Sequence, residues 1–186
     1  MLASSRRVAA RATRATVLST RTFHATPRPL IKVGDAIPDV ELMEASPGNK
    51  VTLSRELASG KGLIIGVPAA FSPSCSSTHI PGYLSHPSLQ SAGKVFVVSV
   101  NDAFVMKAWG ESLDPDGKSK MRFLADPNGT FTSQMEMAFD STAIFGNDRS
   151  KRYAVRTQDG KVTGVDVEPD NTGVNVSAAA KILGKA

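Results

Sequence analysis

The residue with the most evident chemistry in this sequence is a thiol, because Cys75 is the only cysteine among 186 residues. A lone cysteine cannot form an internal disulfide or a Cys-x-x-Cys redox pair. Together with three scattered histidines it does not supply the four ligands of a usual zinc site, and we expect no metal ion and no cofactor. Two interpretations remain, a reactive nucleophile or an inert thiol in the core.

The neighbours of Cys75 favour the nucleophile. Free cysteines are often buried and behave as small hydrophobes, which is the argument for an inert thiol. Here, however, serines precede and follow the cysteine, His79 comes four residues later, and the segment lies where a predicted strand runs into a predicted helix. The amides and the dipole at a helix N-terminus favour an anion. Such surroundings stabilise the thiolate, which is the nucleophilic form of cysteine.

Residues 68–83 resemble the active-site loop of the peroxiredoxins, specifically of the peroxiredoxin-five-like (atypical redoxin) subfamily. The family pattern is Pro, three residues, Thr or Ser, two residues, Cys, and it is met by Pro68, Ser72 and Cys75. Further segments look like landmarks of the subfamily, in the expected order: residues 100–105, 109–110, 124–129, 151–153 and 167–170. Several ordered landmarks are more specific than one short motif. The resemblance covers the chain from about Ile31 onward and indicates a single-cysteine member.

The resemblance implies a thiol-dependent peroxidase. In that chemistry Cys75 attacks the terminal oxygen of hydrogen peroxide or an alkyl hydroperoxide, releases water or an alcohol, and becomes a sulfenic acid. Ser72, in place of the commoner threonine, keeps a hydroxyl that can orient the oxidant, and Pro68 shields the sulfur from water. Arg152 matches the family arginine that reaches the thiolate and the peroxide from a distant strand. His79 either orients the pocket by hydrogen bonding or caps the helix.

One departure from the family pattern concerns the return of the oxidised cysteine to the thiol. Members that resolve internally carry a second cysteine, in some cases in the segment matching residues 173–177, where this chain has Val176. We therefore expect an external thiol reductant, either glutathione with glutaredoxin or thioredoxin, and the sequence does not choose between them. The resemblance also favours a non-covalent homodimer and a role in antioxidant defence and redox homeostasis.

Two other functions could use the same cysteine. The first is a redox-sensing or chaperone-like binding protein, in which oxidation of Cys75 changes assembly and does not clear peroxide. The second is a structural thioredoxin-fold domain with a silent thiol. Only the peroxidase turns over, so steady-state consumption of peroxide with a supplied thiol separates the three.

The elements that must position these residues alternate along the chain. Short apolar runs at residues 62–67, 95–100 and 121–125 are typical of buried strands, and predicted helices follow them at residues 76–85, 103–112 and 130–139. This alternation predicts an α/β fold with a central β-sheet flanked by helices. Asp159 and Gly160, between residues 152–158 and 161–167, predict a β-hairpin, and residues 177–183 are expected to form a last helix. The peroxiredoxin resemblance, and not the periodicity, implies a thioredoxin-like fold.

The positive charge of the chain is concentrated in its first 30 residues. The formal net charge is +5, yet residues 1–30 hold six arginines and no acid, so the remaining 16 basic and 17 acidic residues give a net charge of −1. This distribution argues against a nucleic-acid binder, and an acid-free segment rich in Arg, Ser, Thr and Ala is typical of a mitochondrial transit peptide. We expect a transit peptide at residues 1–30, a peroxiredoxin domain at residues 31–186 and a location in the mitochondrial matrix. No stretch approaches the roughly 20 apolar residues of a membrane span, and the last residues are no Ser-Lys-Leu-type peroxisomal address.

Overall fold

A seven-stranded sheet forms the centre of the protein in the computed structural model, which describes residues 30–185. The predicted transit peptide therefore lies outside the described residues, apart from its last residue. The strands lie in the order β2-β1-β5-β4-β3-β8-β9 across the sheet. Their bounds are β1 Glu41–Glu44, β2 Ser46–Thr52, β3 Lys61–Gly66, β4 Lys94–Ser99, β5 Arg122–Ala125, β8 Tyr153–Gln158 and β9 Lys161–Val167.

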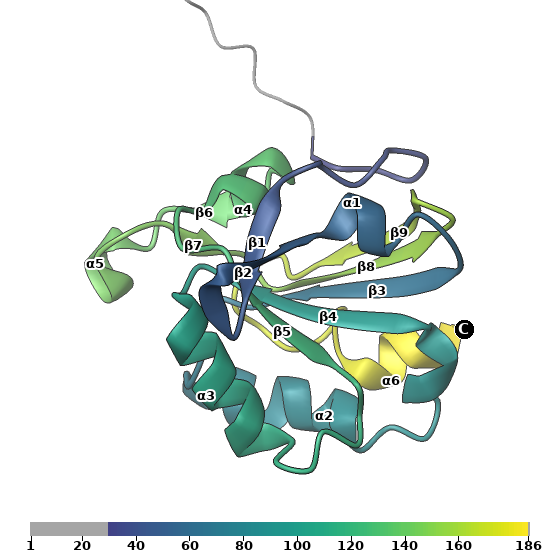
Figure 1. Cartoon of the computed structure of the whole chain (residues 1–186). Coiled ribbons are helices and arrows are strands. Elements are labelled where there is room, and N and C mark those ends of the chain that lie inside the picture. The colour runs from purple at the N-terminus through teal and green to yellow at the C-terminus, as the bar shows by residue number, and fades with distance from the viewer. Residues whose placement is uncertain (1–29, 186) are drawn as a thin grey trace, which may run out of the picture.

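Helices cover both faces of this sheet (Figure 1). One face carries α2 (Ile80–Leu84), α3 (Ala103–Leu113) and α6 (Ala179–Ile182), and the other carries α1 (Leu53–Glu56) and α4 (Thr130–Gln134). The central strand β3 serves both faces, because Leu63 and Ile65 pack into the cluster with α2 and α3 while Ile64 packs into the opposite one. A strand that is buried on both faces needs a nearly continuous apolar run. The predicted α/β fold with a central sheet flanked by helices is confirmed.

The three predicted central strands are present as β3, β4 and β5, and they run parallel to one another. The predicted hairpin is also confirmed, since β8 and β9 pair antiparallel with Gln158 opposite Lys161. Its two-residue turn requires positive φ angles, which Asp159 (48°) and Gly160 (76°) adopt. This hairpin brings the chain back beside β3, where β8 pairs antiparallel.

Two of the predicted helices are shorter than expected. The helix predicted over residues 130–139 ends at Gln134, because Glu136 takes a positive φ of 56° and Met137 turns back to donate its N–H to the carbonyl of Thr132. The chain then forms the short strand β6 (Ala138–Phe139), which pairs with β7 (Arg149–Ser150), with α5 (Thr142–Phe145) between them. The helix predicted over residues 177–183 is α-helical only in α6 and continues as a 3-10 turn.

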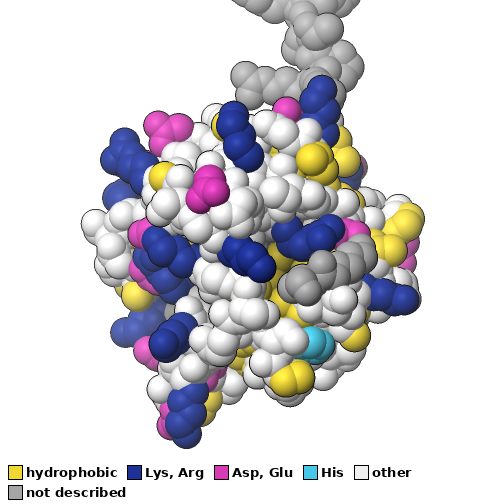
Figure 2. All heavy atoms as spheres, turned by 90° about the vertical axis from the view of Figure 1, so that its right-hand side faces the viewer, with side chains coloured by type: hydrophobic (Ala, Val, Ile, Leu, Met, Phe, Trp, Pro, Cys, Tyr) yellow, Lys and Arg dark blue, Asp and Glu magenta, His cyan; other side chains and the backbone are white. Residues whose placement is uncertain are grey.

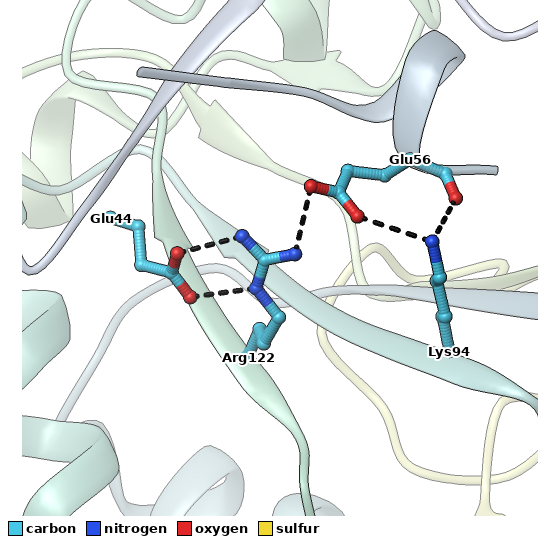
Figure 3. Close-up of polar contacts among 4 residues, drawn as sticks. All are labelled: Glu44, Glu56, Lys94 and Arg122. Carbon is cyan, nitrogen blue, oxygen red and sulfur yellow. Dashed lines mark hydrogen bonds and ion pairs between the residues drawn. The ribbon is translucent and has the colours of Figure 1, made fainter. Parts of the chain in front are cut away.

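A network of four charged side chains ties together one side of the sheet (Figure 3). The Arg122 guanidinium donates from Nε and Nη2 to the carboxylate of Glu44 at 2.8 and 2.7 Å, and its Nη1 lies 3.0 Å from Glu56. Lys94 completes the network at 3.4 Å from the carboxylate of Glu56. The hydrogen bonds to Glu44 are the main cause that raises the pKa of Arg122. The network joins the end of β1, the end of α1 and the starts of β4 and β5.

Candidate active site

Cys75 lies at the start of a helical segment that follows the C-terminal end of β3. After β3 the chain turns through Phe71, whose φ is 59°, and residues Cys75–His79 form one turn of π-helix before α2 begins. The turn is closed by the Ser76 N–H, which donates to the Ser72 carbonyl at 3.0 Å. Pro81 lies in the first turn of α2, as the sequence allows, because the N–H that it lacks has no partner there. Single π-turns are often found at functional sites.

The sulfur of Cys75 is completely buried and in contact with a cation. Arg152, only 1% exposed, donates from Nη1 to the Cys75 sulfur at 3.2 Å, although 77 residues separate the two in the sequence. Its Nε donates to the carbonyl of Thr172 at 3.0 Å. No carboxylate of residues 30–185 forms an ion pair with Arg152. A buried charge without a counter-ion is costly, and the groups that this guanidinium contacts are the Cys75 sulfur, a ring nitrogen of His79 and a backbone carbonyl.

His79 lies behind Arg152 and is also buried. Its Nε2 lies 3.1 Å from the carbonyl oxygen of Ser177, which can only accept, so Nε2 carries the proton. Its Nδ1 then accepts from Nη1 of Arg152 at 3.1 Å. Burial, followed by the charge of Arg152, lowers the pKa of His79 to about 4. The imidazole is therefore neutral at pH 7, and it orients the guanidinium and does not cap the helix.

The structure places Pro68 and Ser72 on the loop that leads to Cys75. Pro68 is buried, Ser72 is half-buried, and no hydrogen bond of the Ser72 hydroxyl is found among residues 30–185. The loop is fixed from β4, because Asn101 accepts the Ala70 N–H at 3.0 Å. This hydroxyl is thus not engaged in a hydrogen bond within the described part of the chain.

Several supporting residues were not identified from the sequence as part of the site. Trp109, expected in the core, is buried there and also donates from Nε1 to the Ser76 hydroxyl at 3.0 Å, which anchors the turn that carries the cysteine. Tyr83 donates its hydroxyl to the Ser177 carbonyl at 2.5 Å and packs edge-on against the His79 ring. The sequence singled out the Ser177 segment only as the place where some family members carry a second cysteine, and not as a partner of His79 or Tyr83.

The two halves of the site meet because β3 ends in a glycine. Gly66 lies opposite Tyr153 in the pairing of β3 with β8, and a Cβ at position 66 would overlap the Tyr153 ring. Arg152 immediately precedes Tyr153. The absence of a side chain at 66 therefore allows the strand that carries the arginine to lie against the strand that carries the thiol loop.

A separate cavity of about 350 Å³ lies at the opposite end of β3, where Lys61, Leu63, Arg156 and Ile182 line it. Figure 2 shows the side of the molecule on which β3 begins, with Lys and Arg side chains around a few hydrophobic ones. Cys75, Arg152 and His79 are not among the residues that line this cavity, so it is separate from the thiol site. Among residues 30–185, no group of three or more His, Cys, Asp or Glu side chains could hold a metal ion. Nor is any helix in that part of the chain long and apolar enough to cross a membrane.

Comparisons with known proteins agree with this geometry. Residues 32–183 match the redoxin family model. "Peroxisomal membrane associated protein 20" of Schizosaccharomyces pombe is 42% identical over 158 residues, which cover 83% of this chain and 98% of that protein. Peroxiredoxin-2E, chloroplastic, of Arabidopsis thaliana is 36% identical over 178 residues, covering 90% of this chain and 75% of that protein.

Solved structures give the same assignment. Peroxiredoxin 5 of Alvinella pompejana superimposes with a TM-score of 0.71 and 38% identity, over 84% of this chain and 99% of that one. Reduced Prx3 of Vibrio vulnificus in complex with hydrogen peroxide gives a TM-score of 0.76 and 33% identity, over 84% of this chain and all of that one. The thioredoxin-like fold implied by the sequence is thus confirmed. The chain belongs to the redoxin family and is a peroxiredoxin of the peroxiredoxin-five-like kind, a thiol-dependent peroxidase.

Proposed function

We propose that Cys75 is the peroxidatic cysteine of a one-cysteine mechanism. The thiolate attacks the terminal oxygen of hydrogen peroxide or an alkyl hydroperoxide, so that an S–O bond forms as the O–O bond breaks. The leaving oxygen takes a proton and departs as water or an alcohol, and the cysteine becomes a sulfenic acid. The observation that carries this proposal is the 3.2 Å contact between Arg152 Nη1 and the buried sulfur.

The other residues of the site act on the oxidant. Arg152 presents a planar cation that can hold the thiolate and the peroxide oxygens together. Ser72 offers a hydroxyl that can accept from one end of the peroxide and donate to the other. Pro68, which has no N–H, excludes water beside the sulfur. His79 acts on the oxidant through Arg152, which it supports from behind by accepting a hydrogen bond at Nδ1.

The sulfenic acid returns to the thiol through an external reductant. Cys75 is the only cysteine of the sequence, so no internal disulfide can form. A first glutathione condenses with the sulfenic acid to a mixed disulfide and releases water. A second thiol then attacks the glutathione sulfur and releases the Cys75 thiol; the product is glutathione disulfide if that thiol is glutathione, or a glutaredoxin–glutathione disulfide if it is glutaredoxin. Thioredoxin would deliver both electrons through its own pair of thiols.

Steady-state peroxide consumption with each thiol system tests the mechanism. We expect turnover with at least one of them, none for Cys75→Ser, and a glutathione adduct by intact-mass analysis when peroxide and glutathione are supplied together. Turnover with thioredoxin alone and no adduct would remove the glutathione branch. If neither thiol system reverses the oxidation of Cys75, the protein is a one-time sensor and not a peroxidase.

The protein is also proposed to form a non-covalent homodimer. Three large apolar side chains near the site are exposed, namely Phe71 (54%), Phe104 (63%) and Ile144 (78%). The segments that carry them are connected, because Asn101 binds Ala70 and Arg149 binds the Val100 carbonyl and packs over the Phe145 ring. An exposed apolar patch often marks a protein interface. Sedimentation velocity should give a dimer for the wild type and a monomer for Phe104→Asp.

A location in the mitochondrial matrix is the last part of the proposal. It is supported by the composition of residues 1–30, and the family match begins just after them, at residue 32. The name of the fission-yeast relative points to the peroxisome for that protein. A fluorescent fusion of the full chain should enter mitochondria, a fusion of residues 31–186 should not, and N-terminal sequencing should place the mature start between about residues 24 and 32. Peroxisomal fluorescence of both fusions would exclude the matrix.

A further inference from the structure

Glu168, directly after β9, carries a buried carboxylate to which the mechanism gives no role. It is 1% exposed, and its Oε1 accepts three hydrogen bonds: from the N–H of Asn175 at 2.7 Å, the N–H of Ser177 at 2.9 Å and the hydroxyl of Ser177 at 2.7 Å. Its Oε2 is buried without a hydrogen-bond partner among residues 30–185. Burial acts to raise the pKa of Glu168, but the hydrogen bonds from Ser177 and Asn175 outweigh it and lower the pKa. The carboxylate is therefore charged at neutral pH.

The segment that Glu168 holds carries the carbonyls that orient the two side chains around the sulfur. The Thr172 carbonyl accepts from Nε of Arg152 at 3.0 Å. The Ser177 carbonyl accepts from Nε2 of His79 at 3.1 Å and from the Tyr83 hydroxyl. Arg152 and His79 therefore both take their orientation from residues 172–177. If residues 172–177 moved, the two carbonyls would move with them and would no longer hold Arg152 and His79 in place.

The backbone of Glu168 is itself bound to that of Arg152. The Glu168 N–H donates to the Arg152 carbonyl at 2.9 Å, and the Arg152 N–H donates to the Asn171 carbonyl at 2.7 Å. Glu168 thus connects the arginine at one end with the Ser177 segment at the other. Hydrogen bonds to an ionised acceptor are roughly twice as strong as those to a neutral one, so the carboxylate holds the donors of Asn175 and Ser177 more firmly than a glutamine amide would.

We propose that Glu168 is the positioning residue of the thiol site: its carboxylate fixes residues 172–177, so that the Thr172 and Ser177 carbonyls hold Arg152 and His79 on the sulfur of Cys75. Glu168 touches neither the sulfur nor the oxidant, and it acts through those two side chains. The proposal rests on the proposed role of Cys75. A displacement of about 1 Å of a group around a reacting atom can lower the rate by as much as 100-fold.

The test compares Glu168→Gln with the wild type in two reactions of Cys75. One is alkylation by iodoacetamide as a function of pH, which reports the thiolate without any peroxide, and the other is single-turnover reduction of hydrogen peroxide. We expect both rate constants at pH 7 to fall on the order of tenfold, and the midpoint of the alkylation profile to move to higher pH. Loss of stability alone would leave that midpoint unchanged in the folded protein.

A second variant covers the case in which Glu168→Gln does not fold. Ser177→Ala removes one of the three donors to Glu168 and leaves both carbonyls in place, and we expect the same change of the alkylation profile with a smaller amplitude. Where both fold, the double variant should be no worse than Glu168→Gln alone, because the two substitutions break the same contact. Additive effects of the two would contradict the proposal.

The matched control is Asp126→Asn. Asp126 is another buried carboxylate, 2% exposed, which accepts the backbone N–H groups of Phe131 and Thr132 at 3.2 and 2.8 Å and forms no hydrogen bond with Cys75, Arg152 or residues 172–177. We expect it to lower stability and leave the alkylation midpoint within experimental error of the wild type. The proposal is overturned if folded Glu168→Gln keeps both rate constants within twofold of the wild type, or if Asp126→Asn moves the midpoint equally. If the wild type is alkylated fast but does not reduce peroxide, the proposed peroxidase mechanism is refuted. The comparison of alkylation rates between the wild type and Glu168→Gln would still test the role of Glu168.

Discussion

Two arginines, Arg122 and Arg152, show how the same side chain serves opposite purposes in this protein. Arg122 is about one-third exposed and is paired with the carboxylates of Glu44 and Glu56. Arg152 is almost fully buried, and its guanidinium contacts a sulfur, an imidazole nitrogen and a backbone carbonyl. The first has its charge neutralised on the protein surface. The second lies in the interior, where no carboxylate of residues 30–185 forms an ion pair with it.

The difference explains why one arginine is structural and the other belongs to the chemistry. An exposed ion pair contributes little free energy, because water competes for both charges. A cation in the interior is not screened by water, so it interacts strongly with the group beside it, which here is the sulfur of Cys75. Neutral His79 preserves this effect, since an ionised imidazole next to Arg152 would repel it.

Replacement of the two arginines should give the largest contrast. For Arg152→Ala we expect the rate constants of alkylation at pH 7 and of peroxide reduction to fall on the order of 100-fold or more, as for the loss of a preorganised charge in an active site. Stopped-flow peroxide reduction and iodoacetamide labelling measure both. For Arg122→Ala neither rate constant should change by more than about twofold. Equal losses in the two variants would show that the fold, and not the charge beside the sulfur, sets the reactivity.

The neutrality of His79 predicts a stability that depends on pH. Its pKa is about 4 in the folded protein and about 6.5 when unfolded, so the unfolded chain binds a proton first as the pH falls. The free energy of unfolding should therefore fall by about 2 kcal/mol between pH 7 and pH 5 on account of this group. Urea denaturation at the two pH values measures it, and His79→Gln should remove most of the difference. A wild-type stability that is flat between pH 7 and 5 would mean that folding does not lower the pKa of His79.

Ser72→Ala should distinguish a role in orienting the oxidant from a role in the reactivity of the Cys75 sulfur. The hydroxyl lies on the loop and forms no hydrogen bond with the sulfur, so we expect peroxide reduction to slow about tenfold while alkylation of Cys75 changes by less than about twofold. The two assays are run on the same preparation, with Ser77→Ala as the exposed serine control. Proportional losses in both assays would assign Ser72 to the thiol environment or to the fold.

The smallest effect is expected for the surface network. Arg122→Ala should lower the free energy of unfolding by about 1 kcal/mol, which is the usual size for exposed ion pairs, and the loss should shrink in high salt. Urea denaturation at low and high ionic strength measures it. A loss of several kcal/mol that does not depend on salt would show that packing of the Arg122 side chain over the Phe96 ring, and not its charge, holds the network.

The sequence predicted the strands of the site more completely than its helices. The runs that became β3, β4 and β5 are buried on both faces, so their composition alone identifies them. By contrast, β2 is mostly exposed and contains Pro47 and Gly48, which gives no strand pattern, and it holds its place only by pairing with β1. The early end of α4 depends on Glu136 taking a positive φ, which no periodicity records.

The site residues likewise divide into those that the sequence indicated and those that only the structure shows. The family resemblance singled out Cys75 and Arg152, and the structure places them in contact; spacing alone could not do so across 77 residues. Glu168 and Ser177 went unnoticed as partners of the site because their roles rest on a buried hydrogen bond between two loop segments. Contacts of this kind leave no periodic signal, since neither segment is a helix or a strand.

Gly66 has a consequence for how this sequence can vary. The site is assembled from two strands whose separation is set by a position with no room for even one methyl group. Any side chain there would push Tyr153 away, and Arg152 with it, while leaving every residue of the thiol loop unchanged. Such a variant would keep all the recognisable motifs of a peroxidase and lose the contact that makes the cysteine reactive. A motif search would accept it, and only the packing of two adjacent strands would reveal the inactive enzyme.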